Sequence, residues 1–125
     1  MKKLTSAEED IMVAVWKTGE ANIKSFMEKL EAPIPPYTTV ASTFKNLEKK
    51  GFLSSRLVGN TYLYKAEIAE EEYKKNFMSG VVKNHFSNSY KDLVNFFVDQ
   101  KKLSSEELKE IIRMIDKDSD NNSNK

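Results

Sequence analysis

Apolar residues recur every three or four positions in the first fifty residues, and this spacing predicts three helices. The first helix is expected to begin at a capping box formed by Thr5 with Glu8 or by Ser6 with Glu9, and to end at Gly19. The second is expected over Asn22–Glu31, because a proline-rich segment prevents its continuation. The third is expected over Tyr37–Lys50.

The third predicted helix has two chemically different faces. Val40, Phe44 and Leu47 form one apolar stripe, which we expect to be buried. The other faces carry Thr38, Thr39, Ser42, Thr43, Lys45, Asn46 and Lys49. Threonine and serine are weak helix formers, so a purely structural exposed face would favour other residues. Short hydroxyl, amide and amine side chains let a helix approach DNA and donate to phosphates or base edges. A merely tolerated polar face is the alternative.

Two short segments rich in β-formers follow, residues 52–58 and 61–65. Gly59 and Asn60 separate them and predict a tight hairpin. Three helices followed by a hairpin is the element order of a winged helix-turn-helix, in which Arg56 and Asn60 would lie on the wing beside the DNA backbone. A plain hairpin that only covers the core is the alternative, and we expect Tyr62 and Tyr64 to pack.

The second half of the chain is predicted to be helical, with breaks near residues 87–89 and before a capping box formed by Ser104 and Glu107. Because a helical segment this short seldom forms a core by itself, we expect it to form a homodimer interface. Its apolar stripes comprise Tyr73, Phe77, Val81, Phe86, Tyr90, Leu93, Val94, Phe97, Leu108, Ile111, Ile112 and Ile115. The predicted organisation is a DNA-binding domain over residues 1–68, a dimerisation region over 69–117 and a disordered tail over 118–125. The fold class is mainly α.

The composition excludes some classes of functional site but does not identify the function. The chain has 125 residues, of which 39% are hydrophobic and 31% charged. It contains no cysteine, which excludes thiolate metal sites and disulfides, and we expect no cofactor. No apolar run is long enough to span a bilayer and no secretory leader is present, so we expect a cytoplasmic protein without membrane insertion.

The net charge of +1 hides an uneven distribution. Between Thr43 and Lys65 the only acidic residue is Glu48, against the basic residues Lys45, Lys49, Lys50, Arg56 and Lys65. A basic patch on a nearly neutral protein is compatible with DNA binding, although a solvated charged face would look the same.

Three segments carry a resemblance to a known family. They are Leu4–Met12 with Val15-Trp16, Tyr37-Thr38-Thr39-Val40 through Leu47–Phe52, and Gly59-Asn60-Thr61-Tyr62. On these residues the chain resembles the BlaI/MecI penicillinase repressors, up to about Lys117. The resemblance implies a dimeric transcriptional repressor that binds dyad operators, often with TACA/TGTA cores. It also implies that Thr38, Thr39, Ser42, Thr43 and Asn46 face the major groove.

The resemblance also concerns regulation. Many members are inactivated when a membrane-bound sensor metalloprotease triggers cleavage in the dimerisation region, commonly at an Asn-Phe bond. Here Phe96-Phe97 stands at that position, and Asn95-Phe96 lies one residue earlier. Copper-responsive relatives have a cysteine-rich tail, which this chain lacks. Pro36 replaces the serine cap of some relatives, so we expect the Thr38 or Thr39 hydroxyl to cap the third helix.

Three other functions fit the sequence less well. An enzyme would need a nucleophile, a base or a metal cluster, and the single histidine, His85, lies among apolar helix residues and is expected to pack or form an interface. A protein–protein adaptor would not need the polar outer face of the third helix. A small-molecule-responsive regulator could use the aromatic-rich second half, although aromatic residues at helical spacing usually form a core.

Overall fold

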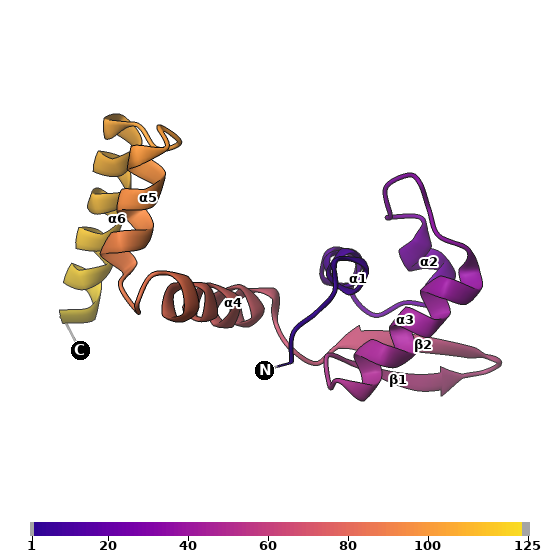
Figure 1. The fold of residues 1–125 in the computed structure, drawn as a ribbon. Helices are drawn as coiled ribbons and strands as arrows, with labels where there is room; N and C mark the ends of the chain where they lie inside the picture. The colour runs from indigo at the N-terminus through magenta and orange to yellow at the C-terminus, as the bar shows by residue number, and fades with distance from the viewer. Residues whose placement is uncertain (1, 124–125) are drawn as a thin grey trace. The chain divides into compact units, whose positions relative to one another are not determined.

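The computed structural model describes the backbone of residues 2–123 and the side chains of residues 2–114. In chain order its elements are α1 (Ser6–Thr18), α2 (Ile23–Met27), α3 (Tyr37–Lys49), β1 (Leu53–Val58), β2 (Thr61–Ala66), α4 (Glu70–His85), α5 (Tyr90–Asp99) and α6 (Ser105–Ser123) (Figure 1). They form two compact units, residues 1–77 and 78–125.

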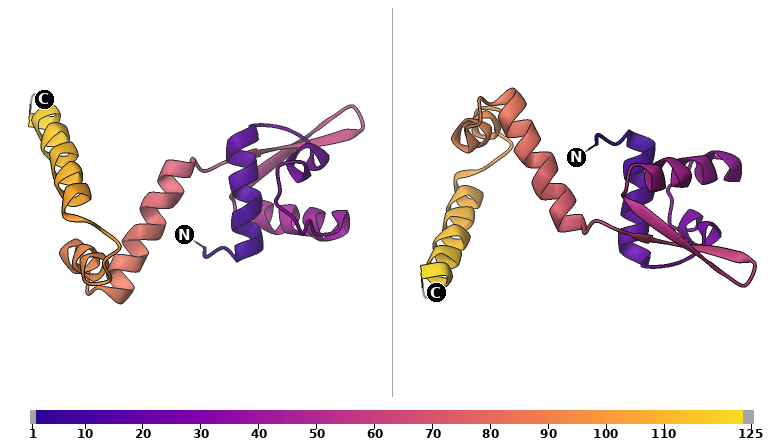
Figure 2. Two further views of the ribbon diagram at one scale, coloured as in Figure 1. Left: turned by 90° about the horizontal axis from the view of Figure 1, so that it is seen from above. Right: turned by 90° about the horizontal axis from the view of Figure 1, so that it is seen from below.

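The N-terminal unit is the predicted winged helix. Its strands β1 and β2 pair in antiparallel register from Leu53 opposite Ala66 to Val58 opposite Thr61. The loop between α1 and α2 adds an isolated bridge to this sheet, because the backbones of Ala21 and Tyr64 exchange two hydrogen bonds of 3.2 and 2.8 Å. The hairpin tip projects away from α1 in both views of Figure 2.

The core of this unit follows the predicted apolar stripes. Val40, Phe44 and Leu47 of α3 are at most 1% exposed. The ring of Phe44 stacks on Phe26 and meets the edge of Tyr64 at a centroid distance of 4.9 Å. Such pairs stabilise a core beyond the area they bury. The packing therefore fixes α3 against both α2 and the hairpin and leaves its other faces outward.

Two details at the ends of α2 and α3 differ from the expectation. The helix α2 ends at Met27 rather than Glu31, because the chain tightens into turns in which the Lys29 and Leu30 amides bond to carbonyls three residues back. Pro36 is the N-cap of α3, and no side chain caps this helix. The expected cap by a Thr38 or Thr39 hydroxyl is therefore wrong.

The helix α4 begins inside the N-terminal unit. Tyr73 is 9% exposed and belongs to the core of that unit, where its ring lies 5.5 Å from that of Trp16. Its hydroxyl donates to Glu9 Oε2 at 2.8 Å, and the Trp16 indole donates to the carbonyl of Ile68 at 2.9 Å. The compact unit consequently reaches Phe77, beyond the boundary expected after residue 68.

Within the second unit, helix boundaries follow local signals. Ser87 and Asn88 have positive φ angles of 51° and 61°, which end the helical path before α5. Ser89 caps α5, and the Ser104–Glu107 capping box opens α6 as predicted. The helix α6 continues to Ser123, past the expected end at Lys117, because no proline or glycine interrupts it. Residues 124 and 125 of the expected tail lie outside the described residues.

Candidate nucleic-acid interface

The outward face of α3 is polar. Thr38, Ser42, Lys45, Asn46 and Lys49 are all exposed, on the side of the helix opposite the buried stripe. The face therefore presents two hydroxyls, one amide and two ammonium groups without any carboxylate. These groups can bond to base edges and to phosphate oxygens.

Thr39 and Thr43 lie on the flank of α3 that faces α1. The Thr43 hydroxyl donates to the Thr39 carbonyl at 3.0 Å, and its side chain is only partly exposed. Both threonines line a cavity of about 290 Å³ together with residues of α1 and of the loop before α3. Thr39 is exposed, whereas the Thr43 hydroxyl is less available to a ligand in front of the helix than those of Thr38 and Ser42.

A groove of about 740 Å³ runs between α3, the start of α2 and the wing. Two of its lining residues, Lys45 and Asn60, are predicted DNA contacts. It is also lined by Lys24, Tyr37 and Tyr62, none of which was predicted from the sequence to contact DNA. Glu48 also lines the groove, where its carboxylate accepts a hydrogen bond from the Ser55 hydroxyl at 2.6 Å. The lysine and tyrosine side chains of the groove can donate to a phosphate backbone.

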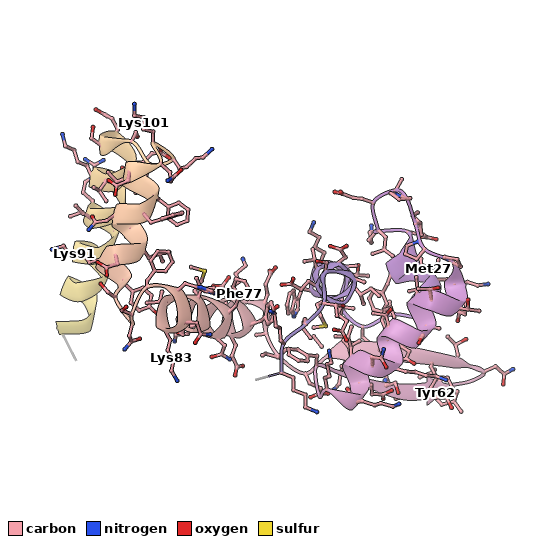
Figure 3. All side chains as sticks on the ribbon, viewed as in Figure 1. Met27, Tyr62, Phe77, Lys83, Lys91 and Lys101 are labelled. Carbon is pink, nitrogen blue, oxygen red and sulfur yellow. The ribbon has the colours of Figure 1, made fainter. Side chains whose placement is uncertain are left out.

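Tyr62 and Tyr64 have different roles. Tyr64 is 6% exposed and packs on Phe44 as expected, whereas Tyr62 is 56% exposed and lies towards the hairpin tip (Figure 3). The expectation that Tyr62 packs is therefore wrong. The two residues share a face of β2, but only Tyr64 lies over α3, and Tyr62 pairs with the exposed Leu57. Strand alternation predicts the shared face but not where the helix above it ends.

Arg56 on β1 is exposed, as a wing residue should be, but it is already paired. Its Nε and Nη2 donate to the two carboxylate oxygens of Glu20 at 3.0 and 2.8 Å. The hydrogen bond from Arg56 is the main reason that the pKa of Glu20 lies below its ordinary value. The same bond raises the pKa of Arg56. No local sequence pattern predicts this pair, because its members are 36 positions apart.

The C-terminal end of α3 is fixed to α1 by a largely buried ion pair. Lys50 Nζ lies 2.7 Å from Glu8 Oε1, and the side chain of Glu8 is only 5% exposed. Glu8 also completes the capping box, accepting from the Thr5 amide at 2.8 Å. Burial raises the pKa of Glu8, but the hydrogen bonds from Lys50 and Thr5 outweigh this effect and leave it below its ordinary value. Lys50 therefore has a structural partner, whereas its neighbour Lys49 is exposed.

The sequence profile of the penicillinase repressor family matches residues 4–117. The chain belongs to this family. The methicillin resistance regulatory protein MecI of Staphylococcus aureus (strain N315) is 26% identical over 120 residues, covering 92% of this chain and 94% of that protein. An uncharacterized 16.5 kDa protein of Latilactobacillus sakei is 23% identical over 115 residues, covering 90% of this chain and 78% of that protein. The solution structure of the DNA-binding domain of the repressor BlaI matches with a TM-score of 0.50 and 27% identity, covering 58% of this chain and 94% of that chain.

Membership of the penicillinase repressor family confirms the sequence resemblance and the winged-helix fold. It is a family of transcriptional repressors and not of enzymes. His85, the last residue of α4, is exposed, so it is not part of the core formed by the described side chains. Among the described residues, no group of three or more acidic or histidine side chains could hold a metal ion, and no helix is long and apolar enough to cross a membrane.

The residues expected at a dimer interface fall into distinct groups. Tyr73 is buried in the N-terminal core, so its assignment to an interface is wrong. Val81, Phe86, Leu93 and Leu108 are partly exposed, whereas Phe77, Tyr90, Val94, Phe97, Ile111 and Ile112 are exposed. The side chain of Ile115 lies outside the described ones. Val82, which was not predicted, is fully buried.

The candidate cleavage site lies within a regular helix. Asn95 and Phe96 are in the middle of α5, and Phe96 is 47% exposed. Its ring contacts Phe86 at 5.7 Å and Phe97 at 5.6 Å. A protease that binds an extended peptide would need α5 to open first.

Proposed function

We propose that this chain is a dimeric transcriptional repressor whose α3 reads a dyad operator in the major groove of DNA. The observation that carries the proposal is the exposed outward face of α3, which holds no carboxylate, beside a groove that contains lysine, tyrosine and asparagine side chains. The one carboxylate that lines the described groove, Glu48, accepts a hydrogen bond from the Ser55 hydroxyl. The related BlaI structure is that of a DNA-binding domain of a repressor. Family membership supports the repressor role here.

The positions of the exposed groups suggest which would contact bases and which would contact phosphates. Thr38, Ser42 and Asn46 are short and lie on the face of α3 that would enter the groove, so they would contact base edges. Lys49, at the end of α3, would contact phosphate. Lys24 and Lys45, which line the groove beside the wing, would follow the same backbone, with Asn60 at the wing tip. Thr39 and Thr43 would contribute from the flank of the helix, chiefly through their methyl groups.

Uncovered apolar side chains in the second unit support the dimer. The described part of α5 contains no buried residue, although Val94, Phe96, Phe97 and Val98 lie on it. Ile111, Ile112 and Met114 of α6 are likewise 40–58% exposed. Apolar surface of this extent usually marks an interface. A second copy would cover it and would place two α3 helices about 34–36 Å apart, one turn of DNA.

Control by proteolysis is a further part of the proposal. A membrane sensor protease would act on the Asn95–Phe96 bond in the cytoplasm and release the repressor by removing the dimer interface. The bond lies in α5, whose described side chains are all at least partly exposed, so local opening of this helix is the step that would admit a protease.

The proposal is tested with DNA from upstream of the protein's own gene. We expect the chain to bind one site there in preference to scrambled DNA. Asn46→Ala should weaken operator binding by about 1–3 kcal/mol and leave scrambled DNA unaffected, because a base contact is lost. Lys49→Ala should weaken both alike and lower the salt slope by about 1. Lys109→Ala, an exposed lysine on α6, is the matched control. Equal binding of operator and scrambled DNA by the parent would refute the proposal.

A further inference from the structure

A two-point contact between Glu20 and Arg56 joins the loop before α2 to the wing. Both donors lie on one edge of the guanidinium, Nε and Nη2, and they bond to the two oxygens of the same carboxylate. Bidentate pairs of this kind fix the orientation of the guanidinium plane as well as its position. The contact therefore determines where Arg56 points.

The carboxylate that holds Arg56 is itself attached to the sheet. Glu20 immediately precedes Ala21, whose backbone exchanges two hydrogen bonds with Tyr64 of β2. It follows Gly19, where a φ of 84° turns the chain out of α1. This turn and the bridge place the Glu20 side chain next to β1, 36 positions later in the chain.

Arg56 retains the capacity to bind a second anion. A guanidinium has five N–H donors, and the contact with Glu20 uses two of them. The Arg56 side chain is 63% exposed, so the remaining donors are open to solvent. Lys65 lies close enough to contribute to the lowered pKa of Glu20. In the hairpin register, Lys65 and Arg56 share a face, because their partners Ser54 and Leu63 alternate with the buried positions.

We propose that Glu20 is a positioning residue for DNA binding, which holds Arg56 by one edge so that its free donors meet a phosphate beside the wing. The inference rests on the proposed function. It assigns to an acidic residue a role that favours binding to a polyanion. If Glu20 only repelled phosphate, removing its charge would strengthen DNA binding. If Glu20 positions Arg56, removing it would weaken DNA binding.

The variant Glu20→Gln distinguishes these two outcomes. Glutamine has nearly the same shape but keeps only one acceptor and no charge, so the two-point hold on Arg56 is lost. If Glu20 positions Arg56, the variant should bind all DNA sequences about 3–10-fold more weakly, and its salt slope should fall towards that of Arg56→Ala. Glu28→Gln removes the same charge from an exposed site at the end of α2 and should bind as tightly as the parent or slightly tighter.

The same substitution in an Arg56→Ala background completes the test. There we expect Glu20→Gln to cause no further loss, because the residue acts through Arg56. Unchanged or tighter binding by Glu20→Gln in the parent background would overturn the inference, as would an equal loss in both backgrounds. The thermal unfolding of each variant is measured alongside, and the salt slope distinguishes lost positioning from a destabilised fold. If the parent itself shows no DNA binding, the proposed function fails, which is a separate result.

Discussion

Replacing Lys50 by methionine is expected to leave the Glu8 carboxylate buried without its cationic partner. Removing one member of a buried ion pair costs about 3–5 kcal/mol. Here the Lys50 side chain is 26% exposed, and Glu8 keeps the hydrogen bond from the Thr5 amide, so we expect a loss of about 2–3 kcal/mol. Glu8→Gln should cost only about 1 kcal/mol, since glutamine also forms a capping box and can accept from Lys50.

The order of the variants is the sharper test. The double variant Glu8→Gln/Lys50→Met contains no stranded charge, so it should be more stable than Lys50→Met alone. Lys49→Met, at the exposed neighbouring position, controls for losing a cation at the end of the helix. Urea unfolding can be followed by the fluorescence of Trp16, the single tryptophan, which lies in the N-terminal unit. Equal losses for Lys50→Met and Lys49→Met, or a double variant less stable than Lys50→Met, would refute this reasoning.

The pH dependence of this pair has a defined sign. The pKa of Glu8 in the folded protein lies below its ordinary value of 4.5. The carboxylate therefore contributes stability above pH 4.5, and this contribution is lost as the pH falls through the folded pKa. In Lys50→Met the stranded carboxylate should accept a proton more easily, so the stability difference from the parent should narrow in acid.

Three further outcomes follow from the structure. A fragment of residues 1–77 should retain the fold of the N-terminal unit but bind a full operator far more weakly than the whole chain, whereas a fragment ending at Ala69 should be about 2–4 kcal/mol less stable by urea unfolding because it lacks Tyr73. Burial and the bond to Glu9 raise the pKa of Tyr73 to about 12. The protonated tyrosine therefore contributes stability that is fully present below pH 10 and is lost as the pH rises from 10 through the folded pKa of about 12. Tyr73→Phe should abolish this decline in an alkaline titration. Cleavage by chymotrypsin after Phe96, followed by mass spectrometry, should slow as protein concentration rises, and a rate independent of concentration would contradict an interface on α5.

The features that the sequence predicted well depend on residues close together in the chain. The Thr5–Glu8 capping box (one of the two that the sequence allowed), the Val40–Phe44–Leu47 stripe and the Gly59-Asn60 turn are each encoded within eight residues, and each is present in the structure. The outward face of α3 follows directly from the stripe, because a helix that buries one side must expose the other.

The features that were missed depend on contacts between distant segments. Tyr73 has the spacing of an interface residue, but its hydroxyl reaches Glu9, 64 positions earlier, and its ring packs on Trp16. Arg56 looks like a free phosphate ligand until the loop containing Glu20 is folded against it. Helical periodicity shows which apolar side chains share one face of a helix, but it does not show whether the same chain or a second copy covers that face.

The polar face of α3 is compatible with a stable helix only because packing holds the helix in place. Its four exposed or flanking serine and threonine residues reduce helix stability by up to roughly 0.7 kcal/mol each relative to alanine. Burial of Val40, Phe44 and Leu47 contributes about 1.5–3 kcal/mol for each side chain, which outweighs that loss. The residues proposed to read DNA therefore contribute little to the stability of the helix that presents them. Changes at Ser42 or Asn46 should consequently alter operator preference without unfolding the domain, so the fold can be kept while the recognised sequence changes.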